Sequence, residues 1–395
     1  MTWDVLTAFA TIMLILTIGE FISTKTRAII PSVFMSAVIF LVGFWTILPK
    51  NLMEMSGLFM PLSMLAMYLI ITHMGTMFSI DELKREWRSA VISLSGVIGI
   101  VAGIIGIGWF VFEKSVLYVS VPPLTGGLVA AIIMKDVAAA KGLPDLSLLA
   151  ILLYVMQGFI GYPLTAYALK KEAKRLQKKF REDEIEIIEV ESSVEKKSDE
   201  DKSFFMIIPK KYQNAYFYFF QTALVAYLAV LTEKLLGGAI SKFVICLVYG
   251  AVGAEIGFIQ KRVLDKTASF GMVLASIMVL IFQSLSTATP DALGKIIVPM
   301  VGVIVFATIG LVIVAMLVGK FLGYSKEMSI AIALNAFYGF PANYVLTNEA
   351  SRAVGESEEE TGYITKNILP KMLVGGFVSV TIVSVIVAGI FSKLL

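Results

Sequence analysis

Two apolar stretches of the chain carry glycine, proline and polar side chains where an uninterrupted membrane helix would carry none: Val119–Met134 and Ala331–Thr347. Lipid cannot hydrogen-bond a backbone that leaves the helix, so irregular chain survives only beside protein or a watery cavity. A helix that begins at such a break points unpaired N–H groups into the membrane. These groups and the helix dipole favour the binding of a carboxylate. Freed carbonyl oxygens favour a small cation. The two breaks therefore predict a binding site for a charged solute.

In the first break, Pro122 and Pro123 remove two backbone donors, so we expect no continuous helix through this segment. The glycines that follow permit positive φ, and a second helix is expected from Leu128 to Met134. The Thr125 hydroxyl either caps that helix or contacts a ligand. The predicted solute contacts of this break are Thr125, Gly126, Gly127 and Leu128.

The second break has the same pattern of a glycine followed by a proline, but it also carries amide and aromatic side chains. Two amides are costly in hydrocarbon without partners. They either satisfy backbone groups freed at the break or contact the solute or a cation directly. The predicted contacts are Asn335, Tyr338, Gly339, Pro341, Asn343 and Tyr344.

Three further polar residues in apolar surroundings are weaker candidates for cation coupling: Asp136, Gln157 and Gln283. Asp136 follows Lys135, so a local ion pair near the outer surface is the alternative for this carboxylate. The two glutamines are equally explained as hydrogen-bonding links between helices.

The composition is that of a membrane protein. Of the 395 residues 57% are hydrophobic and 16% are charged, whereas a soluble domain carries roughly 25% charged residues. Cys246 and His73 are the only residues of their types, which excludes a Cys/His metal site. Motifs of metalloproteases and serine hydrolases are missing as well, so we expect no enzyme. The net charge of +3 gives no reason to expect nucleic-acid binding.

Hydropathy divides the chain into two similar halves joined by a charged linker. Windows of about 20 apolar residues predict crossings near 3–21, 29–48, 58–79, 90–112, 145–169, 213–236, 240–259, 267–288, 292–320 and 364–393. The broken segments, 118–141 and 326–352, take the penultimate place in each half. We therefore predict an all-α membrane protein with repeats at 1–169 and 209–395 and a linker at 170–208.

The basic residues predict the orientation. If the broken segments re-enter without crossing, each half crosses five times, and the two halves are inverted relative to each other. A cytoplasmic linker then places most basic loops inside, as the positive-inside rule requires: Lys25, Arg27, Lys84, Arg85, Arg88, Lys261, Arg262, Lys320 and Lys326. The prediction is a protein of the cell membrane with both termini outside and the first span retained.

Several segments resemble the glutamate–sodium symporter family of inverted-repeat transporters. The resemblance extends over nearly all of the chain except the linker, and includes the runs Gly158–Lys171 and Asn367–Ile390. Gly126 and Gly127 match the family's paired glycines, and Pro341 matches its proline. The resemblance implies the inverted-repeat fold, sodium coupling, an acidic substrate and a homodimer.

The chain departs from the family where side chains would meet the substrate. Leu128 and Val129 replace a His and a Gly, and Phe340 and Ala342 replace two Thr. The aromatic and amide residues of the second break therefore predict a solute of a different shape from glutamate.

Together these features predict sodium-coupled symport of a small anionic or zwitterionic solute, such as a carboxylate or an amino acid. Co-transported Na⁺ or H⁺ is expected, with no other cofactor. The expected partners are the solute, the bilayer and a second copy of the chain. A proton-coupled exporter and a passive channel are the alternatives.

Overall fold

The computed structural model describes residues 3–78, 80–126, 128–188, 213–237, 240, 242–379 and 383–395. Within these ranges the chain is all-helical, and six helices are long and apolar enough to cross a membrane. These six helices are Val5–Lys25, Trp87–Gly108, Pro144–Glu182, Ala215–Leu235, Phe270–Thr287 and Ile296–Phe321. They identify a membrane-embedded protein.

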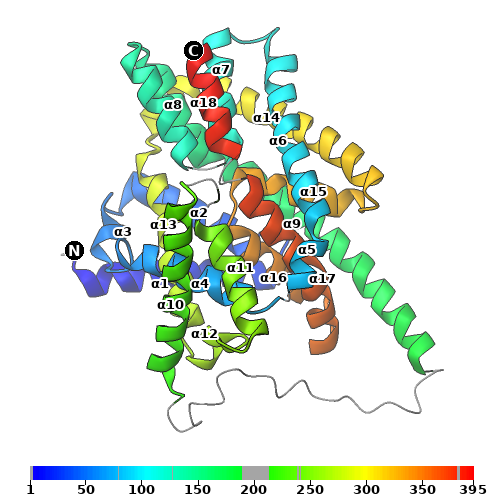
Figure 1. Cartoon of the computed structure of the whole chain (residues 1–395). Helices are drawn as coiled ribbons and strands as arrows, with labels where there is room; N and C mark the ends of the chain where they lie inside the picture. The colour runs from blue at the N-terminus through cyan, green and yellow to red at the C-terminus, as the bar shows by residue number, and fades with distance from the viewer. Residues whose placement is uncertain are drawn as a thin grey trace. The chain divides into compact units, whose positions relative to one another are not determined.

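The order of the helices along the chain can be followed in Figure 1. In chain order they are α1 (Val5–Lys25), α2 (Ser32–Thr46), α3 (Leu52–Met55), α4 (Leu62–Gly75), α5 (Ile80–Arg85), α6 (Trp87–Gly108), α7 (Lys114–Leu124), α8 (Leu128–Ala140), α9 (Pro144–Ile188), α10 (Ala215–Leu235), α11 (Lys242–Glu255), α12 (Val263–Lys266), α13 (Phe270–Gln283), the 3₁₀ turn η2 (Ser284–Thr287), α14 (Pro290–Phe321), α15 (Lys326–Leu334), the 3₁₀ turn η3 (Asn335–Phe337), α16 (Ala342–Val354), α17 (Glu358–Val378) and α18 (Ser384–Leu394).

Some expected crossings are short. Helices α2, α4 and α11 contain 15, 14 and 14 residues, against about 20 for a perpendicular crossing. Helix α9 runs unbroken from Pro144 to Ile188 and so extends into the early part of the segment predicted as a linker. The rest of that linker, 189–208, lies outside the described residues.

Polar caps explain where several helices begin. The side chains of Asp4, Asn214, Ser325 and Ser357 accept a backbone N–H from the first turn of α1, α10, α15 and α17. Each cap satisfies one of the donors that a helix start leaves unpaired. Three glutamates also fill the first turn of α17, where the helix dipole favours negative charge.

The chain forms two compact units, and each takes segments from both sequence halves. Unit 1 comprises Met1–Ser56, Glu86–Gln177 and Ile281–Leu395. Unit 2 comprises Gly57–Arg85 and Lys178–Leu280. Both interrupted helices belong to unit 1.

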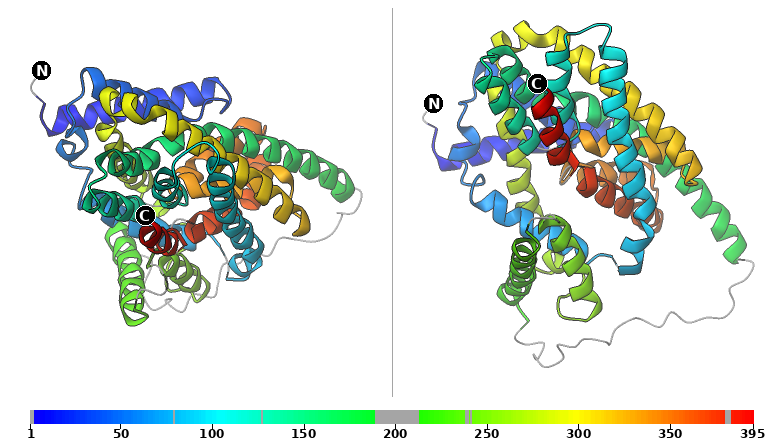
Figure 2. Two further views of the ribbon diagram at one scale, coloured as in Figure 1. Left: turned by 90° about the horizontal axis from the view of Figure 1, so that it is seen from above. Right: turned by 45° about the horizontal axis from the view of Figure 1, so that its top comes forward.

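In unit 1, helices α6 and α14 cross with their backbones in direct contact (Figure 1). A Cβ atom built at Gly103 would lie 2.2 Å from the carbonyl oxygen of Phe306, and one at Gly310 would lie 2.1 Å from that of Gly99. Only glycine permits this approach. Elsewhere in unit 1, α18 packs against both α7 and α8 (Figure 2).

In unit 2, helices α4 and α11 meet in a similar way. Cβ atoms built at Gly75 and Gly250 would lie 2.1 and 2.2 Å from backbone oxygens of the facing helix. The buried ring of His73, on α4, accepts a hydrogen bond from the N–H of Leu264 through Nδ1 (3.1 Å). The only histidine of the chain therefore anchors the start of the loop helix α12.

Candidate functional site at the two interrupted helices

The first interruption follows directly after the two prolines. Helix α7 continues through Pro122 and Pro123 and ends at Leu124, and α8 begins at Leu128, so the segment is not one continuous helix, as predicted. The prolines remove two donors, but their fixed φ is compatible with the last turn of a helix. The chain turns at Gly126, whose φ is +105°, a value that residues with a Cβ rarely adopt.

The buried hydroxyl of Thr125 belongs to α7. It donates to the carbonyl oxygen of Pro122 (2.9 Å), and Thr125 is the C-cap of that helix. Of the two roles expected for this hydroxyl, capping the next helix or contacting a ligand, the cap is not formed, because the hydroxyl faces back along α7. Helix α8 does begin at Leu128. Gly127 and the side chain of Leu128, both predicted contacts, lie outside the described part of the structure.

The second interruption separates α15 from α16. Helix α15 ends at Leu334, the 3₁₀ turn η3 follows, and the chain returns to a helix only at Ala342. Gly339 has a φ of +61°, and Pro341 is the N-cap residue of α16. Glycine permits the left-handed turn, and proline has no N–H to leave unpaired at the helix start.

The two asparagines of this interruption are completely buried. Asn335 Nδ2 donates to the carbonyl oxygen of Ile332, and Asn343 Nδ2 donates to that of Met372, both at 3.0 Å. Neither Oδ1 atom accepts a hydrogen bond from any described residue. The amides therefore satisfy backbone carbonyls with their nitrogens and leave two buried acceptors unpaired.

Tyr338 links the interruption to α9. Its hydroxyl donates to Thr165 Oγ1 (2.7 Å), and its ring packs at 5.4 Å on that of Tyr162. A Cβ atom built at Gly161 would lie 3.1 Å from the Tyr338 ring, so a glycine lets α9 approach this closely. Tyr344 is half-buried on α16, and its carbonyl oxygen accepts a hydrogen bond from Asn348 Nδ2.

A cavity of about 40 Å³ lies beside Tyr338. Five aromatic rings and small or aliphatic residues surround it, and none of its lining side chains is charged. The lining residues are Ala37, Tyr154, Val155, Gly158, Phe159, Tyr162, Ile281, Ser284, Leu285, Phe337 and Tyr338. The arrangement can hold a small, largely desolvated group next to the irregular backbone.

Between described residues, no hydrogen bond, ion pair or ring contact joins the first interruption to the second. Asp136 is exposed on α8 and forms no ion pair with any described residue, so the local pair with Lys135 is not formed. Gln157 and Gln283 each keep an unpaired Oε1 atom. Their neighbours in sequence line the cavity.

Sequence reasoning missed the carboxylate of Glu349, which is 7% exposed on α16. It accepts hydrogen bonds from the hydroxyls of Ser23 and Ser32 and from the N–H of Ser32. These bonds join α16 to the end of α1 and the start of α2. A carboxylate within an otherwise apolar interrupted segment was the available signal.

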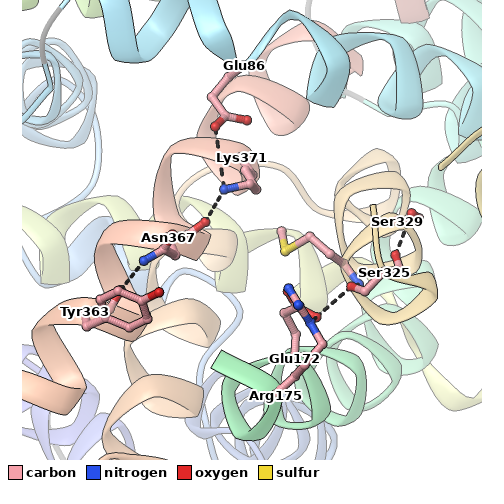
Figure 3. A network of polar contacts seen from close by, with 9 residues as sticks. Glu86, Glu172, Arg175, Ser325, Ser329, Tyr363, Asn367 and Lys371 are labelled. Atoms are coloured by element: carbon pink, nitrogen blue, oxygen red, sulfur yellow. Dashed lines mark hydrogen bonds and ion pairs between the residues drawn. The ribbon is translucent and has the colours of Figure 1, made fainter. Parts of the chain in front are cut away.

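A second group missed from sequence fixes the start of α15 (Figure 3). Ser325, the N-cap of α15, donates to Glu172 Oε2 (2.6 Å), and Glu172 also forms an ion pair with Arg175 at 2.6 Å. The Glu172 side chain is 4% exposed. The charged end of α9 thereby positions the first arm of the second interrupted helix.

In the same view, Lys371 of α17 reaches Glu86. Their charged atoms lie 3.6 Å apart, and the Lys371 side chain is 22% exposed. Glu86 also accepts from the hydroxyls of Ser89 (2.5 Å) and Tyr324 (3.1 Å). Burial raises the pKa of Tyr324 to about 12, so this hydroxyl keeps its proton at neutral pH. Met372, next to Lys371, provides the carbonyl oxygen bound by Asn343.

No protein-family model matches this chain. No curated protein matches it. Function is therefore inferred from the geometry of the two interruptions.

Proposed function

We propose that the chain is a secondary active transporter that carries a small anionic or zwitterionic solute with a co-transported cation. The observation that carries this proposal is the pair of interrupted helices in unit 1, α7–α8 and α15–α16. Irregular backbone and buried amides are costly in lipid unless they contact protein or a ligand. Transporters place discontinuous helices at their binding sites for this reason.

The proposed architecture has ten crossings in two inverted five-helix repeats. Each interrupted segment re-enters from the side on which it began. The linker is cytoplasmic, both termini are outside, and the protein lies in the cell membrane as a homodimer. The distribution of basic residues between the loops supports this orientation.

The solute site is proposed between the two interruptions. The start of α8, after Gly126, offers unpaired N–H groups to a carboxylate. The second interruption offers Tyr338, the two amides and the adjoining cavity. Its uncharged, aromatic lining supports a small solute whose nonpolar part packs on rings. Sodium is the proposed driving ion, in line with the resemblance to the glutamate–sodium symporters.

The size of the cavity supports a transporter over a passive channel. A volume of about 40 Å³ has room for a few water molecules at most, whereas a channel needs a continuous hydrated path. The cavity also lies beside irregular backbone, where alternating-access transporters have their substrate sites.

The test is uptake into proteoliposomes of labelled amino and carboxylic acids under a sodium gradient, a proton gradient or neither. We expect accumulation under the sodium gradient and its loss in Asn343→Ala, with Asn348→Ala as the control on the same helix. Accumulation under the proton gradient alone would indicate a proton-coupled transporter. Equilibration without accumulation under either gradient would contradict the proposal.

A further inference from the structure

The unpaired amide oxygens of the second interruption are the strongest unexplained feature of the molecule. Asn335 and Asn343 are both 0% exposed, and neither Oδ1 has a partner among the described residues. Native proteins pair more than roughly 90% of their buried polar groups, and each unpaired one costs about 1–3 kcal/mol. Two such oxygens in one interrupted helix indicate that a ligand completes them.

The orientation of both amides is fixed by their other ends. Each Nδ2 atom lies 3.0 Å from a backbone carbonyl oxygen, that of Ile332 for Asn335 and that of Met372 for Asn343. Exchanging oxygen and nitrogen would place two acceptors against each other and break both hydrogen bonds. The unpaired atoms are therefore oxygens.

The two amides converge on one glycine of α17. A Cβ atom built at Gly376 would lie 2.5 Å from Asn343 Nδ2 and 3.1 Å from Asn335 Oδ1. Glycine at this position leaves room for both side chains against the α17 backbone. Two residues eight positions apart, separated by η3 and the turn at Gly339, thus both lie against Gly376.

The chemistry of these atoms selects the class of ligand. Neutral oxygen atoms bind hard cations, whereas transition metals prefer nitrogen and sulfur. Calcium and magnesium sites normally include carboxylates, and the described residues contain no group of three or more His, Cys, Asp or Glu able to hold a metal ion. Two neutral amides suit a cation with a single charge. The irregular backbone between η3 and α16 offers carbonyl oxygens as further ligands.

We propose that Asn335 and Asn343 bind one dehydrated Na⁺ through their Oδ1 atoms. This inference rests on the proposed function and extends it to the coupling mechanism. Because both ligands are neutral, the bound ion leaves a buried positive charge without a counter-ion. The carboxylate of the solute provides that counter-charge, so each ligand strengthens the binding of the other by the same factor.

Ion binding is measured without any solute, on the purified full-length protein in detergent. The probe is NaCl, with choline chloride holding the ionic strength constant, and KCl is tested in parallel. A ligand that binds only the folded state raises the unfolding temperature in a saturable way. We expect this rise with Na⁺ and not with K⁺ or choline.

Three variants test the ligands. Asn335→Leu and Asn343→Leu keep approximate size but remove the oxygens, and each should weaken the apparent Na⁺ affinity by about ten-fold or more. Asn348→Leu is the matched control, because Asn348 lies on the same helix and only donates to the Tyr344 carbonyl oxygen. It should retain the full Na⁺ response.

Should the leucine variants fail to fold, Asn343→Asp keeps the proposal testable. It replaces a neutral ligand by a charged one of the same size, and should bind Na⁺ more tightly and respond to Ca²⁺. A Na⁺ response that is absent, or unchanged in all these variants, would overturn the site. So would a response only to the ammonium group of an added amino acid.

Different results would contradict the proposed ion site and the proposed transport function. Sodium binding that depends on the two asparagines, without accumulation of any solute in proteoliposomes, would leave the site intact and refute the transporter. Proton-driven accumulation without a Na⁺ response would refute the site and leave the transporter intact.

Discussion

Replacing Gly376 by alanine places a methyl group directly against the paired asparagines. The added Cβ would lie 2.5 Å from Asn343 Nδ2. Ordinary van der Waals contact begins at 3.4 Å, so the amide must move by about 0.9 Å. That movement stretches its 3.0 Å hydrogen bond to the Met372 carbonyl oxygen beyond the usual limit of about 3.2 Å.

The cost to stability is expected to be small because two effects oppose each other. Breaking the bond leaves a buried donor unpaired, at about 1–3 kcal/mol. Replacing a helical glycine by alanine stabilises the helix by about 1 kcal/mol. The free energy of unfolding should therefore fall by only about 0–2 kcal/mol. The amide oxygens are displaced, however, so Na⁺ affinity should fall by about ten-fold or more.

The assay compares Gly376→Ala with Gly362→Ala, which lies on the same helix and whose added Cβ would have no heavy atom within 4 Å. Unfolding temperature is recorded with and without NaCl for both variants. Gly362→Ala should respond to Na⁺ like the unmodified protein, and Gly376→Ala should not. Equal responses would refute the reasoning, because they would mean that the displaced amides do not bind the ion.

Three further outcomes are expected from the packing of unit 1. Gly103→Leu should prevent folding, seen as aggregation in size-exclusion chromatography, because its Cβ would lie 2.2 Å from a backbone oxygen of α14. Gly106→Leu, on the same helix with open space, should remain monodisperse. Glu349→Ala should lower the free energy of unfolding by about 2–4 kcal/mol, since three donors lose a buried acceptor. Glu20→Ala, which breaks an ion pair at 50% exposure, should cost less than about 1 kcal/mol. Glu172→Gln should speed hydrogen exchange in the first turn of α15, whose N-cap serine it holds; an unchanged rate would contradict that role.

The interruptions were predictable from local chemistry. Gly126 and Gly339 adopt positive φ, which glycine makes easy and other residues rarely adopt. The first helix nevertheless continues through Pro122 and Pro123. A proline removes a donor but ends a helix only when the surrounding packing does not hold the turn, and sequence does not give that packing.

The partners of the polar residues were not predictable. Asn343 meets a carbonyl oxygen and a glycine of α17, 29 and 33 positions away, and Glu349 meets Ser32 across 317 positions. Hydropathy identifies residues that must be buried, but it does not predict which helices contact each other. The long-range contacts follow from close approaches between helices, which depend on the whole unit.

Helix α9 has a mechanical consequence. Its 45 residues make a rod of about 68 Å, against a hydrocarbon core of about 30 Å. Roughly 38 Å therefore extends past any bilayer it crosses perpendicularly. Near Gly161 the helix contacts the second interruption. About 40 Å of helix separates Gly161 from Ile188, so a tilt of about 10° there would move that end by roughly 7 Å. A small tilt of α9 near Gly161 therefore becomes a larger displacement at its C-terminal end. A fluorophore on Lys179→Cys, an exposed position, would magnify small movements of the ion site into a distance that can be measured.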